Sequence, residues 1–212
     1  TSHGFSCLEL NRWFADWRSS GIDLLREKRY AQDGRALHAW VTSTSWSKMD
    51  VFMLNEMRNN IYAAKVNAII PWAGIQRSNF WKQGDPNPGT AIRVLEDGSY
   101  QVEPGYYYYK QLSRAGQPGM GVARVSSNDT QICPIAFSSN GTRHADNFVL
   151  LNLSDEVKRP EVVLKGNRAG GFQIYRTSPS DSYCSLGHLS APEQSFPIEL
   201  PPLSVTTFLG EG

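Results

Sequence analysis

The change of sequence period near residue 119 constrains the fold of this chain more than any other feature. Before it, apolar residues recur at helical intervals in some segments and form continuous runs in others. After it, no helical period remains, and short β-rich runs are separated by turn residues. About seven such runs follow: GVARVSS, TQICPIAFSS, NFVLLNLS, PEVVLKG, GFQIYRTS, QSFPIEL and SVTTFLG. Regular short strands of this kind predict an antiparallel β-sandwich or barrel over residues 119–212.

Residues 1–118 combine helical patterns with patterns of parallel strands. A helix that ends at Gly21 is predicted by CLELNRWFADWRSSG, and a helix or turn that ends at Gly34 by DLLREKRYAQDG. A strand follows in LHAWVTSTSW. The continuous apolar run VNAIIPWAG reads as a second strand, covered on both faces of a parallel sheet. The alternation of strands and helices predicts a parallel α/β arrangement.

The segment between these two strands, SKMDVFMLNEMRNNIYAAK, predicts an amphipathic helix because its apolar residues recur at helical intervals. Ser47 and Asp50 have the spacing of a capping box at its start. Further along, a hairpin that turns at an Asp-Gly pair is predicted by AIRVLEDGSYQV. One more helix, entered after Pro104 and stopped at Gly116, is predicted by EPGYYYYKQLSRAGQPG.

The first half is too small to stand alone as predicted. Two parallel strands with their helices leave unprotected edges and bury too little for an independent core. A complete (β/α)8 barrel needs about 250 residues, and only the 118 residues before the predicted sandwich are present. The chain opens at TSHGF without Met, as a mature product, a trimmed form or a fragment would. We therefore favour the C-terminal part of a larger protein over a compact packing of this half on the sandwich.

Composition excludes several classes of function. The net charge is +1 and the basic residues are scattered, so we expect neither nucleic acid nor anionic lipid as a partner. The most apolar run is too short to span a membrane. Metal-ligand clusters, phosphate loops and nucleotide fingerprints are lacking in the sequence, so no metal or cofactor is expected. Cys133 and Cys184 could form a disulfide, or could equally be free thiols, and Cys7 completes the odd count.

Two weaker signals point towards carbohydrate and secretion. The chain has six Trp, nine Tyr and nine Phe, a density that is common at sugar sites, although most of these rings are expected in a core. The triplets NDT, NGT and NLS permit N-glycosylation at Asn128, Asn140 and Asn152. We expect a secreted or extracytoplasmic protein.

Several motifs together resemble glycoside hydrolase family 30, a family of retaining clan A β-glycosidases that includes glucosylceramidases, xylanases and β-1,6-glycanases. The run MRNNIYAAKVNAIIPW is similar to its seventh helix and eighth strand, and YYYYKQLSRAGQPGMGVARV to its eighth helix leaving the barrel. IELPPLSVTTFLG resembles the last sandwich strand, and SHGF the end of the sixth strand. The resemblance implies the C-terminal part of a (β/α)8 barrel over residues 1–118, followed by a β-sandwich over 119–212. It also implies that a segment before the barrel contributes strands to the sandwich.

The family uses two glutamates, an acid/base after strand four and a nucleophile after strand seven, about 5–5.5 Å apart. Strand four would lie upstream of Thr1, so the acid/base is expected in a missing N-terminal part of the same barrel. The family pattern for strand seven is roughly Trp-x-Thr-Glu. Trp40 and Thr42 match it, which places Ser43 where the nucleophile belongs. A neutral serine cannot replace a carboxylate there, so we expect this chain alone to be inactive.

Three explanations for Ser43 stay open: an engineered change from glutamate, a natural departure in an inactive member, or a misplaced register. The strand ends and the loop after the eighth strand would supply sugar contacts, since functional side chains gather at the carboxyl ends of barrel strands. The expected substrate-binding residues are His3, Phe5, Trp46, Trp72, Gln76 and Trp81.

Two hypotheses of function follow from these patterns. The first is a retaining glycoside hydrolase that cleaves O-glycosyl bonds in a β-linked glycan, here as a fragment or in a form that lacks its nucleophile. The second is a non-catalytic carbohydrate-binding or structural protein, in which the sandwich is the stable unit.

Overall fold

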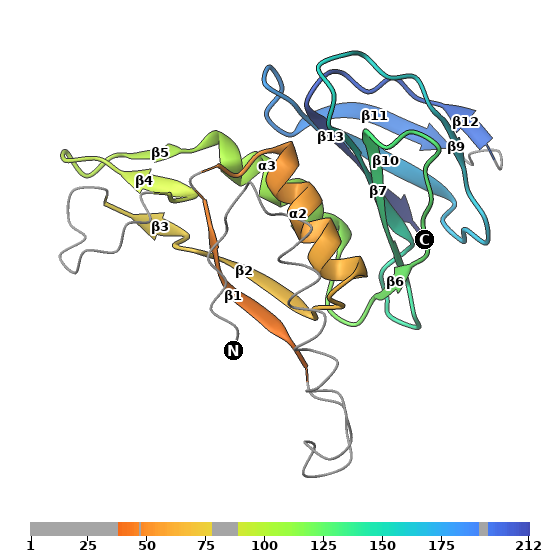
Figure 1. Ribbon diagram of the computed structural model, residues 1–212, viewed down its shortest axis with the longest axis horizontal. Helices are drawn as coiled ribbons and strands as arrows, with labels where there is room; N and C mark the ends of the chain where they lie inside the picture. Colours follow the sequence, from red (N-terminus) through yellow and green to blue (C-terminus); the bar gives the residue numbers. More distant parts are fainter. Residues whose placement is uncertain (1–37, 47, 78–88, 191–194) are drawn as a thin grey trace, which may run out of the picture. The chain divides into compact units, whose positions relative to one another are not determined.

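The computed structural model describes residues 38–46, 48–77, 89–190 and 195–212. The chain divides into two compact units, one ending at Tyr106 and the other spanning Tyr107–Gly212 (Figure 1). The two helical segments predicted before Gly34 lie outside the described residues.

The first unit is built on a parallel strand–helix–strand element. Strand β1 (Trp40–Ser45) pairs in parallel with β2 (Ala68–Trp72), and helix α2 (Val51–Tyr62) connects them (Figure 1). The predicted parallel pairing is confirmed. A small apolar core lies at the start of the two strands and after the helix, formed by Ala39, Val41, Ala64, Val66 and Ile69.

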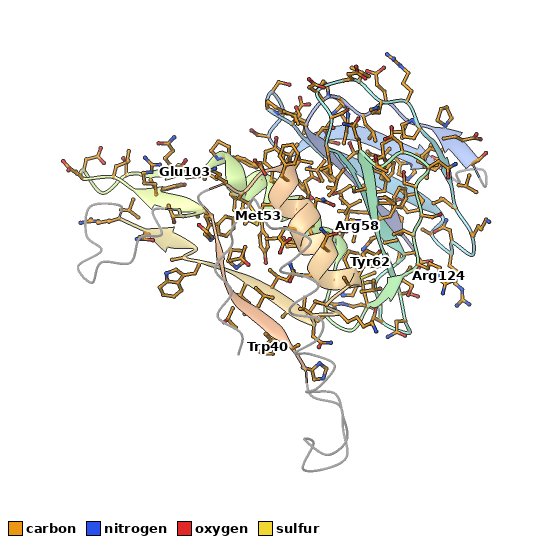
Figure 2. All side chains as sticks on the ribbon, viewed as in Figure 1. Trp40, Met53, Arg58, Tyr62, Glu103 and Arg124 are labelled. Atoms are coloured by element: carbon orange, nitrogen blue, oxygen red, sulfur yellow. The ribbon has the colours of Figure 1, made fainter. Side chains whose placement is uncertain are left out.

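Helix α2 begins at a single capping residue. The Asp50 carboxylate accepts hydrogen bonds from the backbone N–H groups of Phe52 and Met53, at 2.9 and 3.0 Å. The predicted capping box is wrong, because Asp50 is itself the N-cap, and Ser47 lies outside the described residues. Met53 is buried, in keeping with the predicted amphipathic helix. Further along α2, the Arg58 guanidinium lies over the Tyr62 ring, 5.4 Å from its centroid (Figure 2).

The expectation that β2 is covered on both faces is wrong. Ile70 is 45% exposed and Trp72 44% exposed. On the neighbouring strand, Trp40 is 52% exposed. Within the described part of the chain, β1 and β2 pair only with each other. The continuous apolar run of β2 is therefore not buried on both faces in this unit.

A three-stranded sheet completes the first unit. Strand β3 (Ile75–Gln76) pairs in parallel with β4 (Ile92–Val94), which forms an antiparallel hairpin with β5 (Tyr100–Val102). Gly98, at φ +85°, occupies the left-handed position of the predicted Asp-Gly turn. Helix α3 (Pro104–Ala115) follows, within the predicted limits.

The second unit contains a six-stranded antiparallel sheet in the order β11-β10-β13-β8-β7-β6 (Figure 1). A separate pair, β12-β9, forms a second, smaller sheet. Each of the seven predicted runs contains a strand, and the structure adds β11. The strands are β6 (Gly121–Ala123), β7 (Ile132–Ser138), β8 (Asn147–Asn152), β9 (Glu161–Val163), β10 (Gly171–Thr177), β11 (Cys184–Ser190), β12 (Ser195–Pro197) and β13 (Ser204–Glu211).

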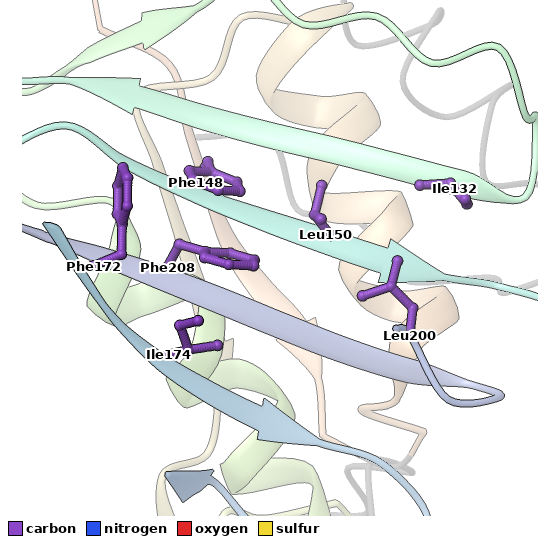
Figure 3. Packing of buried hydrophobic residues seen from close by; sticks show 7 residues of the cluster. All are labelled: Ile132, Phe148, Leu150, Phe172, Ile174, Leu200 and Phe208. Carbon is purple, nitrogen blue, oxygen red and sulfur yellow. The ribbon is translucent and has the colours of Figure 1, made fainter. Parts of the chain in front are cut away.

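The main core of this unit lies between the large sheet and the small one. Three phenylalanine rings form its centre (Figure 3): Phe148 stacks on Phe208 at 4.2 Å between centroids, and Phe172 meets both rings edge-on. Val162 of β9 and Phe196 of β12 pack against this cluster. The unit is therefore a two-sheet β-sandwich, as predicted.

Helix α3 covers the opposite face of the large sheet. Gln111 Nε2 donates to Thr177 Oγ1 at 2.9 Å, and Thr207 Oγ1 donates to the Gln111 carbonyl at 3.2 Å. Asn147 Nδ2 donates to the Ala115 carbonyl at 2.8 Å. These contacts explain why the compact unit begins at Tyr107, before the sandwich boundary predicted at residue 119.

The cysteines of the described chain are not paired. Cys133 is a buried free thiol and Cys184 an exposed one, so the disulfide considered for them is absent. Cys7 lies outside the described residues. Among the described helices, none is long and apolar enough to cross a membrane.

Candidate active site

The carboxyl ends of β1 and β2 lie side by side in the first unit. The register pairs Thr44 with Pro71 and Ser45 with Trp72. Because parallel strands end at the same edge of a sheet, side chains after these residues share one neighbourhood, where α/β proteins usually place their functional groups. Trp46 and Trp72, both predicted as sugar contacts, belong to this edge.

A β-bulge interrupts β1 just before this edge. Val41 pairs with Ile69 and Thr44 with Pro71, so Thr42 and Ser43 together oppose Ile70. Bulges bend a strand and turn a side chain away from the regular alternation, and they are frequent next to active sites. Ser43 is thus part of an irregular strand segment, while its side chain lies outside the described part of the structure.

The two tryptophans of the edge differ in exposure. Trp46 is 9% exposed and Trp72 is 44% exposed. The peptide bond between Trp72 and Ala73 is cis. A ring that stacks on a pyranose needs an accessible face, which Trp72 has and Trp46 lacks.

Gln76 lies in β3, opposite Arg93 in the register of the small sheet. Its side-chain oxygen is shielded from solvent and accepts no hydrogen bond from the described residues. Buried polar atoms normally have a partner, so this oxygen has acceptor capacity that the described residues do not use. The other predicted contacts, His3, Phe5 and Trp81, lie outside the described residues.

No carboxylate is placed at the edge by β1 or β2, because neither strand contains an acidic residue. Nearby acids have structural roles: Asp50 caps α2, Glu56 accepts from Asn60 Nδ2 at 2.8 Å, and Glu103 pairs with Arg93 at 2.7 Å. Hydrogen bonds from Ser99 lower the pKa of Asp97 in the hairpin turn. The described residues therefore do not supply a pair of carboxylates at the strand ends.

The sequence predicts no metal site, and the structure bears on this prediction only through the described residues. In that part, no group of three or more His, Cys, Asp or Glu residues could hold a metal ion.

A groove in the second unit was not anticipated from the sequence. Its volume is about 930 Å³, and it opens on the core face of β7 and β8 and along β9. Its lining includes Ile132, Ala136, Phe148, Leu150, Val162 and Leu164. PEVVLKG is as long as GVARVSS or SVTTFLG, so nothing in its length signals that its strand, β9, has only three residues and leaves this face of the large sheet partly open.

This architecture has counterparts among solved protein structures. No protein-family model matches the sequence, and no curated protein matches it. Among solved structures, the chain is similar to a glycoside hydrolase family 30 endoxylanase from Clostridium papyrosolvens C71, with a TM-score of 0.68 and 17% identity over 90% of this chain and 46% of the other. Over the aligned part, the chain has a fold similar to that of family 30 structures. The resemblance predicted from the sequence is confirmed at the level of the fold.

Two further structures support the same fold. One is the catalytic domain of family 30 xylanase C from Talaromyces cellulolyticus, with a TM-score of 0.62 and 17% identity over 84% of this chain and 41% of that one. The other is a conserved exported protein from Bacteroides fragilis, with a TM-score of 0.68 and 13% identity over 95% of this chain and 43% of that one. This chain thus spans less than half the length of each of these structures.

Proposed function

We propose that this chain is the C-terminal part of a protein related to the retaining β-glycosidases of family 30. In this proposal, residues 1–118 contain the last strands of a (β/α)8 barrel, with β1 as the seventh and β2 as the eighth, and residues 119–212 form the sandwich. The order of elements carries the proposal: a parallel β1–α2–β2 unit, then α3, then a six-stranded antiparallel sheet. The similarity of this whole series to a family 30 endoxylanase, over 90% of the chain, supports it.

The chemistry of the strand ends supports binding rather than cleavage by this chain alone. A retaining enzyme needs a nucleophilic carboxylate about 5–5.5 Å from its acid/base. We assign the nucleophile position to Ser43, in the bulge of β1, and β1 and β2 contribute no acid that could replace it. The neutral hydroxyl cannot take the carboxylate's role. The exposed Trp72 ring and the Gln76 amide would then hold a sugar without reaction.

The substrate class is a β-linked glycan or glycoside. Two of the similar structures are xylanases by name, so xylo-oligosaccharides are the first probes. The exported protein among the similar structures supports a secreted or extracytoplasmic location.

The missing part of the barrel is the expected partner of this chain. The exposed apolar side chains of β1 and β2, Trp40, Ile70 and Trp72 among them, support neighbouring strands outside the described residues. The open groove beside β9 likewise agrees with the family feature in which a segment before the barrel adds strands to the sandwich.

The deciding experiment begins with the native and intact mass of the protein isolated from its source. We expect a longer polypeptide or a tightly bound N-terminal part. In that assembly, Ser43→Glu should produce hydrolysis of xylo-oligosaccharides or another β-linked glycan with retention of anomeric configuration. Ser43→Gln, of the same length but without the charge, is the matched control and should stay inactive. A folded, unaccompanied monomer of 23.7 kDa would overturn the barrel assignment.

The lack of acids in β1 and β2 favours one second candidate, a carbohydrate-binding protein without catalysis. Titration of the protein with xylo-oligosaccharides separates the two proposals. If sugar binds at the barrel edge, Trp72→Ala should abolish binding. Binding that is unchanged in this variant would assign the sugar site to the sandwich instead.

A further inference from the structure

The second unit contains three Asn-X-Ser/Thr triplets whose asparagines have different surroundings. They are Asn128, Asn140 and Asn152. N-glycosylation requires an asparagine side chain that can carry a bulky, solvated substituent. The fold, which the triplets alone do not reveal, determines which of the three meets this requirement.

Asn152 is closed to modification in the folded protein. It is completely buried at the end of β8, and its amide nitrogen donates to the carbonyls of Glu156, Leu200 and Pro201 at 2.8, 3.1 and 2.8 Å. Its side-chain oxygen accepts from the backbone N–H and the hydroxyl of Ser154, at 3.0 and 2.7 Å. Ser154 is itself buried. The Asn152 side chain therefore joins the end of β8 to the segment before β13.

Asn140 is exposed but already engaged. It occupies the left-handed region at φ +47°, and its amide nitrogen donates to the Gly119 carbonyl at 3.0 Å. The hydroxyl of its triplet, on Thr142, donates to the Ser139 carbonyl at 2.7 Å. A glycan on Asn140 would replace one of the two amide protons and crowd a turn that this hydrogen bond holds in place.

Asn128 stands at the tip of a loop that other residues hold in shape. The Ser127 hydroxyl and the Asp129 carboxylate make the turn, the latter by accepting from the Gln131 N–H at 2.8 Å. Asn128 and Thr130 are both exposed. Asn128 also lines the groove of the second unit, so a substituent on its exposed amide would stand at the rim of that groove without breaking the hydrogen bonds of the turn.

We propose that Asn128 is an N-glycosylation site of this protein and that Asn152 carries no glycan in any folded copy. In the reaction, the amide nitrogen of Asn128 attacks the anomeric carbon of a lipid pyrophosphate-linked oligosaccharide. A C–N bond forms, the bond to the phosphate oxygen breaks, one amide proton is lost and the lipid pyrophosphate leaves. This inference uses only residues of the second unit and needs no catalytic activity; because Asn128 lines the groove beside β9, an occupied site requires that this rim of the groove stays open.

The test is secretion of the complete 212-residue chain from a eukaryotic host, followed by intact mass measurement before and after peptide-N-glycosidase treatment. We expect a glycan mass that the enzyme removes, with conversion of Asn128 to aspartate in the peptide map. Thr130→Ala should abolish the modification at Asn128, whereas Thr130→Ser, which preserves the triplet, should retain it. Occupancy at Asn140 should be lower than at Asn128.

Two results would overturn the inference. One is soluble, folded, secreted protein that carries no glycan at Asn128. The other is a glycan on Asn152, or occupancy of Asn140 above that of Asn128, in protein whose circular dichroism and thermal transition match those of the unmodified chain.

Discussion

The two units of this protein differ most in how completely their strands are covered. In the second unit, every residue of β8 is buried, because β13 and β7 flank it and because α3 and the small sheet lie over its two faces. In the first unit, β2 alternates between half-buried and exposed residues. Similar apolar runs thus have different surroundings. Those of the second unit are buried in its core, whereas β2 of the first unit lies beside a small core and still presents exposed apolar side chains.

The incomplete coverage of the first unit also affects its candidate site. Barrel-like parallel sheets place their sites at strand ends, and those sites are complete only when the sheet is closed. The carboxyl ends of β1 and β2 have a bulge and an exposed Trp72, and Gln76 in β3 has a shielded side-chain oxygen, but the strands β1 and β2 themselves contain no acid. Strands that covered the exposed sides of β1 and β2 would therefore also be the elements able to complete the site.

The largest expected effect concerns the phenylalanine cluster of the second unit. Phe208→Ala removes a fully buried ring that stacks on Phe148 at 4.2 Å. It should lower the free energy of unfolding by about 3–5 kcal/mol, because the cavity cannot close. Urea unfolding of the full chain, followed by far-UV circular dichroism, measures this loss.

The matched control is Trp72→Ala in the first unit, which removes a larger ring that is 44% exposed. It should change the unfolding free energy much less than Phe208→Ala does. An equal or greater loss from Trp72→Ala would mean that the first unit is as fully packed as the second, and the comparison would fail.

A second prediction addresses the polar link between β8 and the chain before β13. Asn152→Ala removes the amide that donates to the carbonyls of Glu156, Leu200 and Pro201 and accepts from the backbone N–H of Ser154. Each of these carbonyls keeps another donor, but a hydrogen bond contributes about 0.5–1.5 kcal/mol. We therefore expect the loss of several to cost at least about 2 kcal/mol in the same urea measurement. Asn128→Ala, on an exposed loop, should stay within about 0.5 kcal/mol of the parent. A near-neutral Asn152→Ala would contradict the assigned role.

A third prediction tests the first unit directly. Asp50→Ala removes the side chain that caps α2 and should cost about 1 kcal/mol. Asp50→Asn retains the accepting oxygen and should recover most of the loss. Two measurements check this: the urea midpoint, and hydrogen exchange of the Phe52 and Met53 amides. Both amides donate to the Asp50 carboxylate, so the cap should slow their exchange. Equal exchange in both variants would argue against the cap.

Most elements of the fold could be predicted from the sequence because local patterns determine them. The Asp-Gly hairpin, the Pro-to-Gly limits of α3 and seven strands of the second unit all followed from turn residues and period. Strand β11 could not be found this way. Its segment, CSLGHLS, is polar and mostly exposed, and it becomes a strand because β10 offers an edge with matching register, with an irregularity beside Ile174.

The candidate site was less accessible to sequence reasoning for a physical reason. The family comparison could locate Ser43 along the strand, but the bulge beside it depends on how β1 and β2 pair across space. The contrast between Trp46 and Trp72 is likewise set by their surroundings and not by their similar positions at strand ends. The apolar run of β2 predicted burial on both faces, although burial depends on strands that lie elsewhere in a chain.

The smallest expected effect concerns the edge of the large sheet in the second unit. His188 of β11 reaches across Gly171 to Glu211 of β13, with 2.8 Å between His188 Nε2 and Glu211 Oε2. A Cβ on Gly171 would lie 2.6 Å from that nitrogen, so only glycine allows this approach. Gln173 donates to the other carboxylate oxygen at 2.9 Å.

These hydrogen bonds, first from Gln173 and then from His188, lower the pKa of Glu211 below its ordinary value of 4.5. A carboxyl whose pKa is lower in the folded state stabilises the protein above the unfolded value, and this contribution is lost as the pH falls through the folded value. Glu211→Gln should therefore flatten the fall of the thermal midpoint on the acid side of pH 4.5, with little change near neutrality because the group is exposed. Asp155→Asn, at a surface carboxylate on the loop after β8, is the matched control and should leave the acid slope closer to that of the parent. If both variants give the same acid slope, the Glu211 contacts do not contribute to stability, and the attachment of β11 depends on its backbone ladder with β10 alone.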